Sequence, residues 1–280
     1  MTQFLVFRLY GPMVAWGDIA VGERRPTANR PSRSAVLGLI AGALGIERSD
    51  QERQTVLRDS LGVASRIDIP GRLMHDYHTA QVPSESWCKD QTKRWKDKPR
   101  HGGPLWTRGE ELEGRDDLST ILSERAYLAD TLALVAVWLK GPDGTIALAD
   151  VAQALGRPVF APFLGRKSCP PALPFVPQLV DADHPVQALQ SVDFAAKEAD
   201  ALKAVLARRA WPEQVLRTAD EQRHSVGRQF AWEGQWPAVS GLSELISVER
   251  RDEPGRRRAW QFHTRIEHLA HEVPKERAHG

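Results

Sequence analysis

The sequence has little cysteine and no long hydrophobic run. Its 280 residues include only two cysteines, which excludes a disulfide framework and a metal site built from cysteine alone. The longest apolar run, residues 132–139, is far shorter than the roughly 20 residues that a membrane-spanning helix needs. Residues 1–10 lack the basic region and the small-residue cleavage site of a signal peptide. A cytoplasmic location without membrane contact is therefore the simplest expectation.

The sequence also lacks the short motifs of the common enzyme classes. It contains no Walker A loop, dinucleotide fingerprint, nucleophile elbow or zinc motif. His75 and His78 have the spacing of a metal-ligand pair, but no nearby cysteine or glutamate completes a site. We therefore expect neither a metal nor a cofactor.

Lysine is scarce relative to arginine. The chain has 9 lysines and 29 arginines, although its net charge is only +2. The planar guanidinium suits bidentate recognition of phosphate, but a high-GC genome gives the same bias, so position matters more than number. Hydrophobic residues (41%) and charged residues (26%) are at ordinary globular levels. At this length we expect one elaborate domain or two small ones.

Hydrophobic periodicity predicts a mixture of strands and helices. Residues 4–10 are nearly all apolar and end at Gly-Pro, which is typical of a buried strand. Residues 33–44 predict a helix, with Ser32 or Ser34 as its N-cap and Gly45 as its stop. The other expected helices are residues 51–61, 148–155 and 194–209. The other expected strands are residues 66–73 and 131–139. We expect strands or strand–helix mixtures at residues 235–248 and 258–268.

The loop before the first helix is basic. Arg24, Arg25, Arg30 and Arg33 lie within ten residues, and the one acid beside them is Glu23. The start of a helix carries about half a positive charge, so cations there are unfavourable unless an anion is bound. A bound anion would be held jointly by the helix amides, a serine hydroxyl and the guanidinium groups. The alternative is a solvated loop whose arginines pair with acids elsewhere in the chain.

Residues 165–168, with the sequence GRKS, form a second candidate for phosphate binding. They lie in a proline-rich stretch, residues 157–177, that contains few acids. An ordinary surface turn explains these residues equally well, and we expect the whole stretch to run over the surface.

A third candidate is the segment from about residue 77 to residue 114, which has almost no aliphatic side chains. Cations alternate with tryptophans there, a composition typical of proteins that bind single-stranded nucleic acid. Because the segment cannot bury a core, we expect it to project or to be disordered when free. A helix would place Lys89, Lys93, Lys96 and Arg100 on one face, whereas a hairpin strand would divide the charges between two faces.

The polar cluster around Tyr77 allows two interpretations. A set of His, Tyr and Lys side chains can cleave RNA without metal, with one group acting as base and another as acid. Alternatively, His78 and Tyr77 are structural or contact RNA without cutting it. We favour the second interpretation, with no catalytic residue.

Several short motifs, in order, resemble the CasD family of RNA-handle-binding subunits in type I-E CRISPR Cascade complexes. They are LYGPMVAWG at 9–17, RPT at 25–27, PSRSAVLGL at 31–39, DYHT at 76–79, RAYLAD at 125–130, LGRKSCPP at 164–171 and, more weakly, RDEP at 251–254. The matches extend over residues 5–171 and reappear near residue 251. Residues 193–241 form a longer segment than the family needs.

The resemblance implies an α+β fold of the repeat-associated mysterious protein (RAMP) type. Such a fold has an RRM-like, ferredoxin-type antiparallel sheet, the palm, with a protruding insertion, the thumb. The palm would comprise residues 1–78 and 123–180, the basic and aromatic thumb residues 79–122, and a C-terminal α/β extension residues 181–280.

The resemblance further implies a non-catalytic subunit that hooks the 5′ handle of CRISPR RNA (crRNA). It would cap the backbone of the complex, contact its backbone subunits and large subunit, and act on target DNA only indirectly. In a sister subtype the corresponding subunit is itself a nuclease, so a metal-free endoribonuclease that processes repeat RNA is the alternative. The expected RNA-binding residues are Gly11, Trp16, Arg25, Thr27, Arg30, Ser32, Arg33, Ser34, Tyr77, His78, Lys89, Lys93, Arg94, Trp95, Lys96, Lys98, Arg100, Arg166, Lys167 and Ser168.

Overall fold

The structure is a computed structural model that describes residues 1–87, 89–90, 109, 112, 118–141, 146–192, 228–255 and 261–273. The chain divides into two compact units. The main unit comprises Met1–Ile19, Pro26–Met74 and Tyr127–Gly280, and the ribbon unit comprises Ala20–Arg25 and His75–Ala126.

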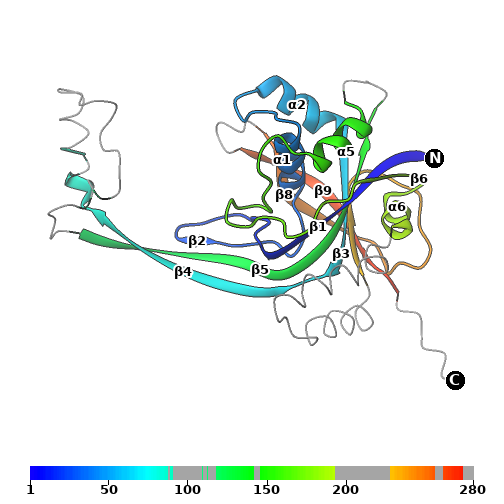
Figure 1. Cartoon of the computed structure of the whole chain (residues 1–280). Coiled ribbons are helices and arrows are strands. Elements are labelled where there is room, and N and C mark those ends of the chain that lie inside the picture. Colours follow the sequence, from blue (N-terminus) through cyan, green and yellow to red (C-terminus); the bar gives the residue numbers. More distant parts are fainter. Residues whose placement is uncertain are drawn as a thin grey trace. The chain divides into compact units, whose positions relative to one another are not determined.

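The main unit is built on an antiparallel sheet. Its described strands lie in the order β6-β1-β5-β3-β7-β9-β8, and each neighbouring pair is antiparallel (Figure 1). The strands are β1 (Thr2–Val14), β3 (Leu61–Ile69), β5 (Leu118–Leu139), β6 (Gln178–Ala182), β7 (Gln229–Trp232), β8 (Ile246–Pro254) and β9 (Phe262–His271). The expected antiparallel α+β class is confirmed.

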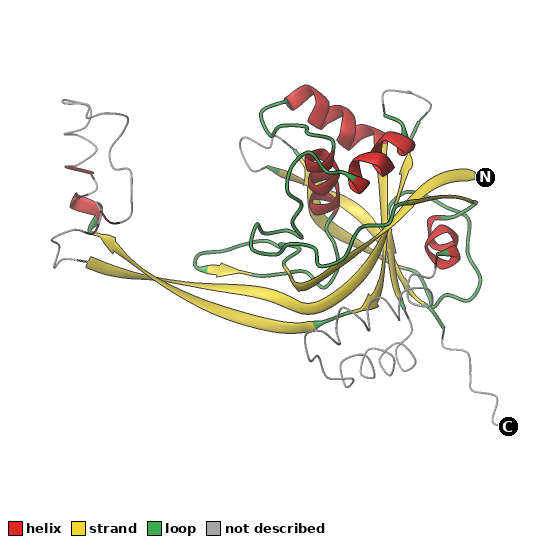
Figure 2. Cartoon of the chain, in the orientation of Figure 1, coloured by secondary structure: helices red, strands yellow, loops and turns green. Residues whose placement is uncertain are grey.

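Helices cover both faces of this sheet (Figure 2). The helices α1 (Arg33–Ala43), α2 (Gln51–Ser60) and α5 (Leu148–Gly156) belong to one face, and α6 (Pro185–Ser191) to the other. Alternation along β1 supplies both cores, because successive side chains of a strand point to opposite faces. Leu5 and Phe7 enter the core beneath α1, and Phe4 and Val6 enter the core beneath α6.

The elements with strong local signals lie where the sequence places them. The buried strand at 4–10 is the centre of β1, and the helices expected at 33–44, 51–61 and 148–155 are α1, α2 and α5. Ser32 is the N-cap of α1, and its hydroxyl accepts a hydrogen bond from the amide of Ala35 at 3.2 Å. The strand expected at 131–139 is the C-terminal part of β5.

The strand expected at 66–73 is wrong as a single element. A turn at Pro70-Gly71 separates β3 from β4 (Arg72–Pro83), and Gly71 has a φ of +75°. Proline removes a donor from the ladder and glycine adopts this φ freely, so the dipeptide ends one strand and begins another.

Short elements near the C-terminus carried weaker signals. No sequence pattern indicated β6, α6 or β7, which have between four and seven residues. The strand expected from residue 235 begins only at Ile246, and the expected helix at 194–209 lies outside the described residues. Within the described parts of the chain, no helix is both long enough and apolar enough to cross a membrane.

The ribbon unit contains residues 75–83 of β4, residues 118–126 of β5 and the short strand β2 (Arg24–Arg25). β2 pairs in parallel with β5, with Arg24 opposite Glu124 and Arg25 opposite Arg125. Nearly all side chains of β4 are exposed or half-buried. The described ribbon therefore has almost no core of its own, since a two-stranded ribbon buries little surface.

Candidate nucleic-acid interface

The 164–168 loop contacts β1 and the residue that follows it in the main unit. The amide of Ala15 donates a hydrogen bond to the carbonyl oxygen of Leu164 at 3.1 Å. Next to it, Gly165 has a φ of +88°, and a Cβ atom there would lie only 1.6 Å from the carbonyl oxygen of Ala15. Gly11 also lies against Leu164, because a Cβ on that glycine would be 2.8 Å from a leucine methyl group. Glycine thus allows the 164–168 loop to touch the chain that follows β1.

The 164–168 loop closes on itself and presents its basic residues. Its backbone bonds join Leu164 N to Cys169 O at 2.7 Å and Cys169 N to Arg166 O at 2.9 Å. Arg166 lies over the ring of Tyr127, with its guanidinium carbon 4.5 Å from the ring centre. Lys167 and Ser168 are exposed. The loop therefore offers a cation and a hydroxyl to solvent from a fixed backbone.

Hydrogen bonds fix the segment that follows β1 to the start of α1. The amide of Trp16 donates to Thr27 Oγ1 at 3.0 Å, and Ser32 Oγ donates to the carbonyl oxygen of Trp16 at 3.1 Å. Ser34 Oγ lies 3.1 Å from Ser32 Oγ. Trp16 is only 4% exposed and belongs to the core, so its ring packs in the fold instead of presenting a face for base stacking.

The anion at the start of α1 is a carboxylate of the protein itself. The backbone amide of Arg33 donates to Asp252 Oδ2 at 2.8 Å. Asp252 is buried and comes from β8, far away in the sequence. An anion does lie at this helix end, as the positive charge of the helix start predicts, but it is the Asp252 carboxylate and not a phosphate.

The Arg33 side chain corrects the sequence-based expectation. It is fully buried, and its Nε lies 2.9 Å from Glu233 Oε2 and 3.0 Å from Glu253 Oε2. Its Nη2 donates to the carbonyl oxygens of Arg58 and Leu61, each at 2.7 Å. A guanidinium committed in this way to protein oxygens is not accessible to RNA.

Arg30 is also held by the protein. Its Nε donates to Glu267 Oε2 at 2.8 Å, and its side chain is 12% exposed. Glu267 also pairs with Arg250 at 3.1 Å and with Arg265 at 2.7 Å. Burial alone raises the pKa of Glu267, but Arg250, Arg265 and Arg30 together hold that pKa below its ordinary value. The expected role of Arg30 as a free phosphate ligand is therefore corrected as well.

These carboxylates are the residues that sequence reasoning missed. Asp252, Glu233, Glu253 and Glu267 all lie in the C-terminal third of the chain, for which we had no functional expectation. The one available signal was the RDEP motif at 251–254, which contains two of them.

The ribbon unit carries other predicted residues on its surface. Arg25 is exposed, and its Nη1 donates to the carbonyl oxygens of Gly22 at 2.5 Å and Arg24 at 3.0 Å. Tyr77 is 64% exposed, and Lys89 pairs with Glu85 at 2.8 Å. The remaining predicted residues, Lys93, Arg94, Trp95, Lys96, Lys98 and Arg100, lie outside the described residues, as does the choice between helix and hairpin for them.

The histidines of β4 do not form one acid–base pair. His78 Nε2 contacts Asp76 Oδ2, and His75 Nδ1 lies 2.5 Å from Glu124 Oε1. Residues 75 and 78 have opposite parity in a strand, so their side chains point to opposite faces. Among the described residues, no group of three or more His, Cys, Asp or Glu side chains is placed to hold a metal.

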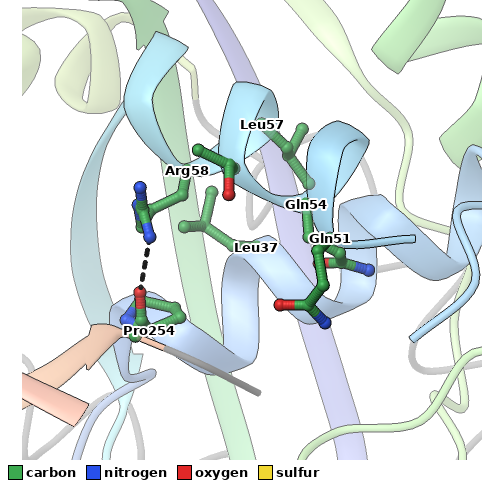
Figure 3. A pocket seen from close by; sticks show the side chains of 8 residues that line it. Leu37, Gln51, Gln54, Leu57, Arg58 and Pro254 are labelled. Atoms are coloured by element: carbon green, nitrogen blue, oxygen red, sulfur yellow. Dashed lines mark hydrogen bonds between the residues drawn. The ribbon is translucent and has the colours of Figure 1, made fainter. Parts of the chain in front are cut away.

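A hollow beside the buried arginines is separate from the predicted site. Leu37, Gln51, Gln54, Leu57, Arg58 and Pro254 line it (Figure 3). Arg58 Nη1 donates to the carbonyl oxygen of Pro254 at 3.4 Å across it. Because no predicted RNA-binding residue lines this hollow, we assign it no ligand.

Asp130, the last residue of the RAYLAD motif, is in an unfavourable environment. It has a φ of +59°, and its buried Oδ1 has no hydrogen-bond partner among the described residues. Burial raises the pKa of this carboxyl to about 6, although Arg72 opposes the shift. A raised folded-state pKa means that the fold loses stability as the pH rises from about 4 to about 6.

Asp130→Asn is therefore expected to stabilise the fold at pH 7.5 by about 1–2 kcal/mol and to change little at pH 4. Asparagine keeps the shape and tolerates this φ, but it removes the desolvated charge. Urea unfolding at the two pH values measures the effect, with Asp181→Asn on β6, an exposed aspartate, as the control. An equal gain at both pH values would contradict the electrostatic cause.

Comparisons with known proteins agree on one family. The family model described as CRISPR-associated protein (Cas_Cas5) matches residues 4–240 of this chain. The CRISPR system Cascade subunit CasD of Escherichia coli (strain K12) is 29% identical over 249 residues, which cover 86% of this chain and 97% of that protein.

Solved structures share the fold. A chain of a structure described as a CRISPR RNA-guided surveillance complex aligns with a TM-score of 0.54 at 22% identity, over 97% of this chain and 91% of that chain. A second, described as a crystal structure of Cas protein, aligns with a TM-score of 0.51 at 24% identity, over 98% of this chain and 96% of that chain. This chain belongs to the CRISPR-associated Cas5 family, and the resemblance to CasD that the motifs indicated is confirmed.

Proposed function

We propose that this protein is the CasD-type subunit of a type I-E Cascade complex and holds the 5′ handle of crRNA without cutting it. The observation that supports the proposal is the docking of the 164–168 loop on the chain at Ala15, because the next residue, Trp16, is hydrogen-bonded to Thr27 and Ser32 before α1. The similar E. coli protein is named as a Cascade subunit, which supports the same assignment. Cations on a fixed backbone bind phosphates with a smaller ordering cost than cations on a mobile loop.

The proposed handle site has a frame and a set of contacts. The frame consists of Gly11, Trp16, Thr27, Ser32 and Ser34. The ion pairs that Arg30 and Arg33 make with Glu267 and Glu233 stabilise this frame. In the main unit, the proposed direct RNA contacts are Arg166, Lys167 and Ser168. A second, separate set of proposed RNA contacts belongs to the ribbon unit: Arg25, Tyr77, His78, Lys89, Lys93, Arg94, Trp95, Lys96, Lys98 and Arg100.

We assign the palm of the RAMP architecture to four strands and to the two helices that lie between them in the sequence. The strands β6-β1-β5-β3 form one antiparallel block, with α1 between β1 and β3 and α5 between β5 and β6 in the sequence. This β-α-β-β-α-β order is that of a ferredoxin-type, RRM-like unit. In this assignment residues 1–78 and 123–180 are the palm, 79–122 the thumb and 181–280 an extension of the same sheet.

The ribbon unit is the proposed contact surface for backbone subunits. Tyr77, Ile121 and Leu122 of this unit are exposed. A two-stranded ribbon with uncovered apolar side chains gains stability when a partner covers it. In this proposal the large subunit and the guide are further partners, and target DNA is reached through the guide.

The handle site is tested by the salt dependence of RNA binding. The double variant Arg166→Ala/Lys167→Ala should weaken binding of labelled handle RNA and reduce the slope of log K against log salt by about 1.4, because each phosphate contact contributes about 0.7 for single strands. The double variant Arg48→Ala/Arg53→Ala is the control, because it removes the same charge from exposed positions before and within α2. Equal affinity and slope for both double variants would refute the placement of the site.

The purified wild-type protein can also be used to test whether this subunit only binds RNA or cleaves it. Incubation of the wild-type protein with repeat RNA in EDTA should leave the RNA intact. Metal-free cleavage that His78→Ala abolishes would overturn the non-catalytic part of the proposal and support an endoribonuclease.

A further inference from the structure

We infer that Asp252 is a positioning residue for RNA binding: its carboxylate occupies the anion position at the start of α1 and holds the segment 26–33 ready for the handle. The inference rests on the proposed function. It assigns a role to the β8–β9 hairpin, for which the sequence suggested none.

The contacts of Asp252 are those of a bound anion. Its Oδ2 accepts from the amide of Arg33 at 2.8 Å and from Arg265 Nη2 at 3.1 Å, and it lies 3.3 Å from Arg250 Nε. Its Oδ1 accepts from Arg265 Nε at 2.6 Å. One carboxylate thus receives a helix amide and two guanidinium groups, the donor set that binds phosphate at helix starts in other proteins.

A second carboxylate of the same hairpin secures the loop before the helix. Glu267 holds the Arg30 side chain, while Arg250 donates to the carbonyl oxygens of Arg30 at 3.2 Å and of Pro31 at 3.3 Å. The side chains and backbone at positions 30, 31 and 33 are therefore all tied to β8 and β9. The chain from Thr27 to Ser32 is tied in turn to Trp16, so the hairpin indirectly supports both candidate RNA-binding loops.

Every carboxylate in this cluster is paired with a cation. The guanidinium groups of Arg30, Arg33, Arg250 and Arg265 face the carboxylates of Glu233, Asp252, Glu253 and Glu267, and Lys140 Nζ also lies 3.3 Å from Glu233 Oε1. Because these guanidinium groups are already paired with protein carboxylates, the cluster does not need an RNA phosphate as a counter-charge. Its contribution to binding is that the loops are ordered before the RNA arrives, which lowers the ordering cost of association.

Two variants of Asp252 test the contribution of its charge separately from that of its side-chain volume. Asp252→Ala removes the carboxylate and leaves room for a small anion, whereas Asp252→Asn removes the charge and keeps the volume. Both should weaken binding of handle RNA by about tenfold, the factor that corresponds to about 1.4 kcal/mol. Val186→Ala, in the core beneath α6, serves as the stability control, since it should lower the melting temperature without changing the RNA affinity at a temperature where all variants are folded.

Chemical rescue tests the anion position directly. Sodium formate, compared with sodium chloride at equal ionic strength, should raise the melting temperature of Asp252→Ala and restore much of its RNA affinity. It should leave the wild type and Asp252→Asn unchanged, because in both the position is filled.

The outcomes distinguish the inference from the proposed function. If the wild type binds handle RNA and the Asp252 variants bind it as tightly as Val186→Ala does, Asp252 is only structural and the inference is wrong. Absence of rescue by formate in a folded Asp252→Ala would refute the anion position. If the wild type does not bind handle RNA, the proposed function fails together with the positioning role, even where formate still stabilises Asp252→Ala.

Discussion

Replacement of Arg33 by methionine is expected to destabilise the fold by about 3–5 kcal/mol, the usual cost of removing one partner from a buried ion pair. Methionine fills similar space but leaves Glu233 and Glu253 beside an apolar side chain. It also removes the donor for the carbonyl oxygens of Arg58 and Leu61. Urea unfolding at pH 7.5 measures the loss.

The cause of this loss can be separated from the loss of packing. Burial already raises the pKa of Glu253, with Arg33 as the main opposing charge, so removal of Arg33 should raise that pKa further. The destabilisation should therefore shrink at low pH, where the carboxyls accept protons. The triple variant Arg33→Met/Glu233→Gln/Glu253→Gln should recover part of the stability, because it leaves neither of these carboxylates without its arginine, and Lys140, which loses Glu233, is partly exposed to solvent. A loss below about 1 kcal/mol for Arg33→Met alone would contradict the burial of this ion pair.

Replacement of Gly165 by alanine is expected to produce the second large effect. The new Cβ would meet the carbonyl oxygen of Ala15 at 1.6 Å, and alanine would also have to adopt a φ of +88°. The positive φ alone costs about 1–3 kcal/mol. The backbone clash forces the 164–168 loop away from the chain after β1 and breaks the bond between Ala15 and Leu164. We expect a markedly lower melting temperature and a loss of handle-RNA affinity of more than tenfold.

The chain offers a matched control for this substitution. Gly156, at the end of α5, has no atom within 4 Å of an added Cβ. Gly156→Ala should leave the melting temperature unchanged or raise it slightly, because alanine favours the helix by up to about 1 kcal/mol. If Gly165→Ala behaves like Gly156→Ala, the two loops are not in the close contact described. Thermal unfolding and the RNA-binding assay on both variants give the answer.

The hairpin contacts divide the arginines before α1 into two groups. A cluster of arginines near a helix start is unfavourable by itself. Here Arg30 is paired with Glu267, and Arg33 is paired with Glu233 and Glu253. Their sequence neighbours Arg25 and Asn29 stay exposed. One short basic segment thus divides between stabilising the fold and facing solvent, which its sequence alone does not distinguish.

The sequence by itself determined the parts that depend on nearby residues. The apolar run at 4–10 defined β1, and the Ser32 cap, apolar face and Gly45 stop defined α1, because strand and helix signals arise within one element. The order of short motifs indicated the family, which the family model and the E. coli relative confirm. The GRKS motif also marked the loop that contacts the chain at Ala15.

Only the tertiary structure decided which side chains remain available for RNA. The partners of Arg30 and Arg33 lie 237 and 200 residues away in the sequence, and the carboxylate on the amide of Arg33 lies 219 residues away. No local pattern specifies such pairs, because sheet pairing between β3, β7, β9 and β8 brings them together. An unpaired charge is costly when it is buried, so Arg30 and Arg33 pair with these carboxylates. Lys167 lies in an exposed loop and remains at the surface.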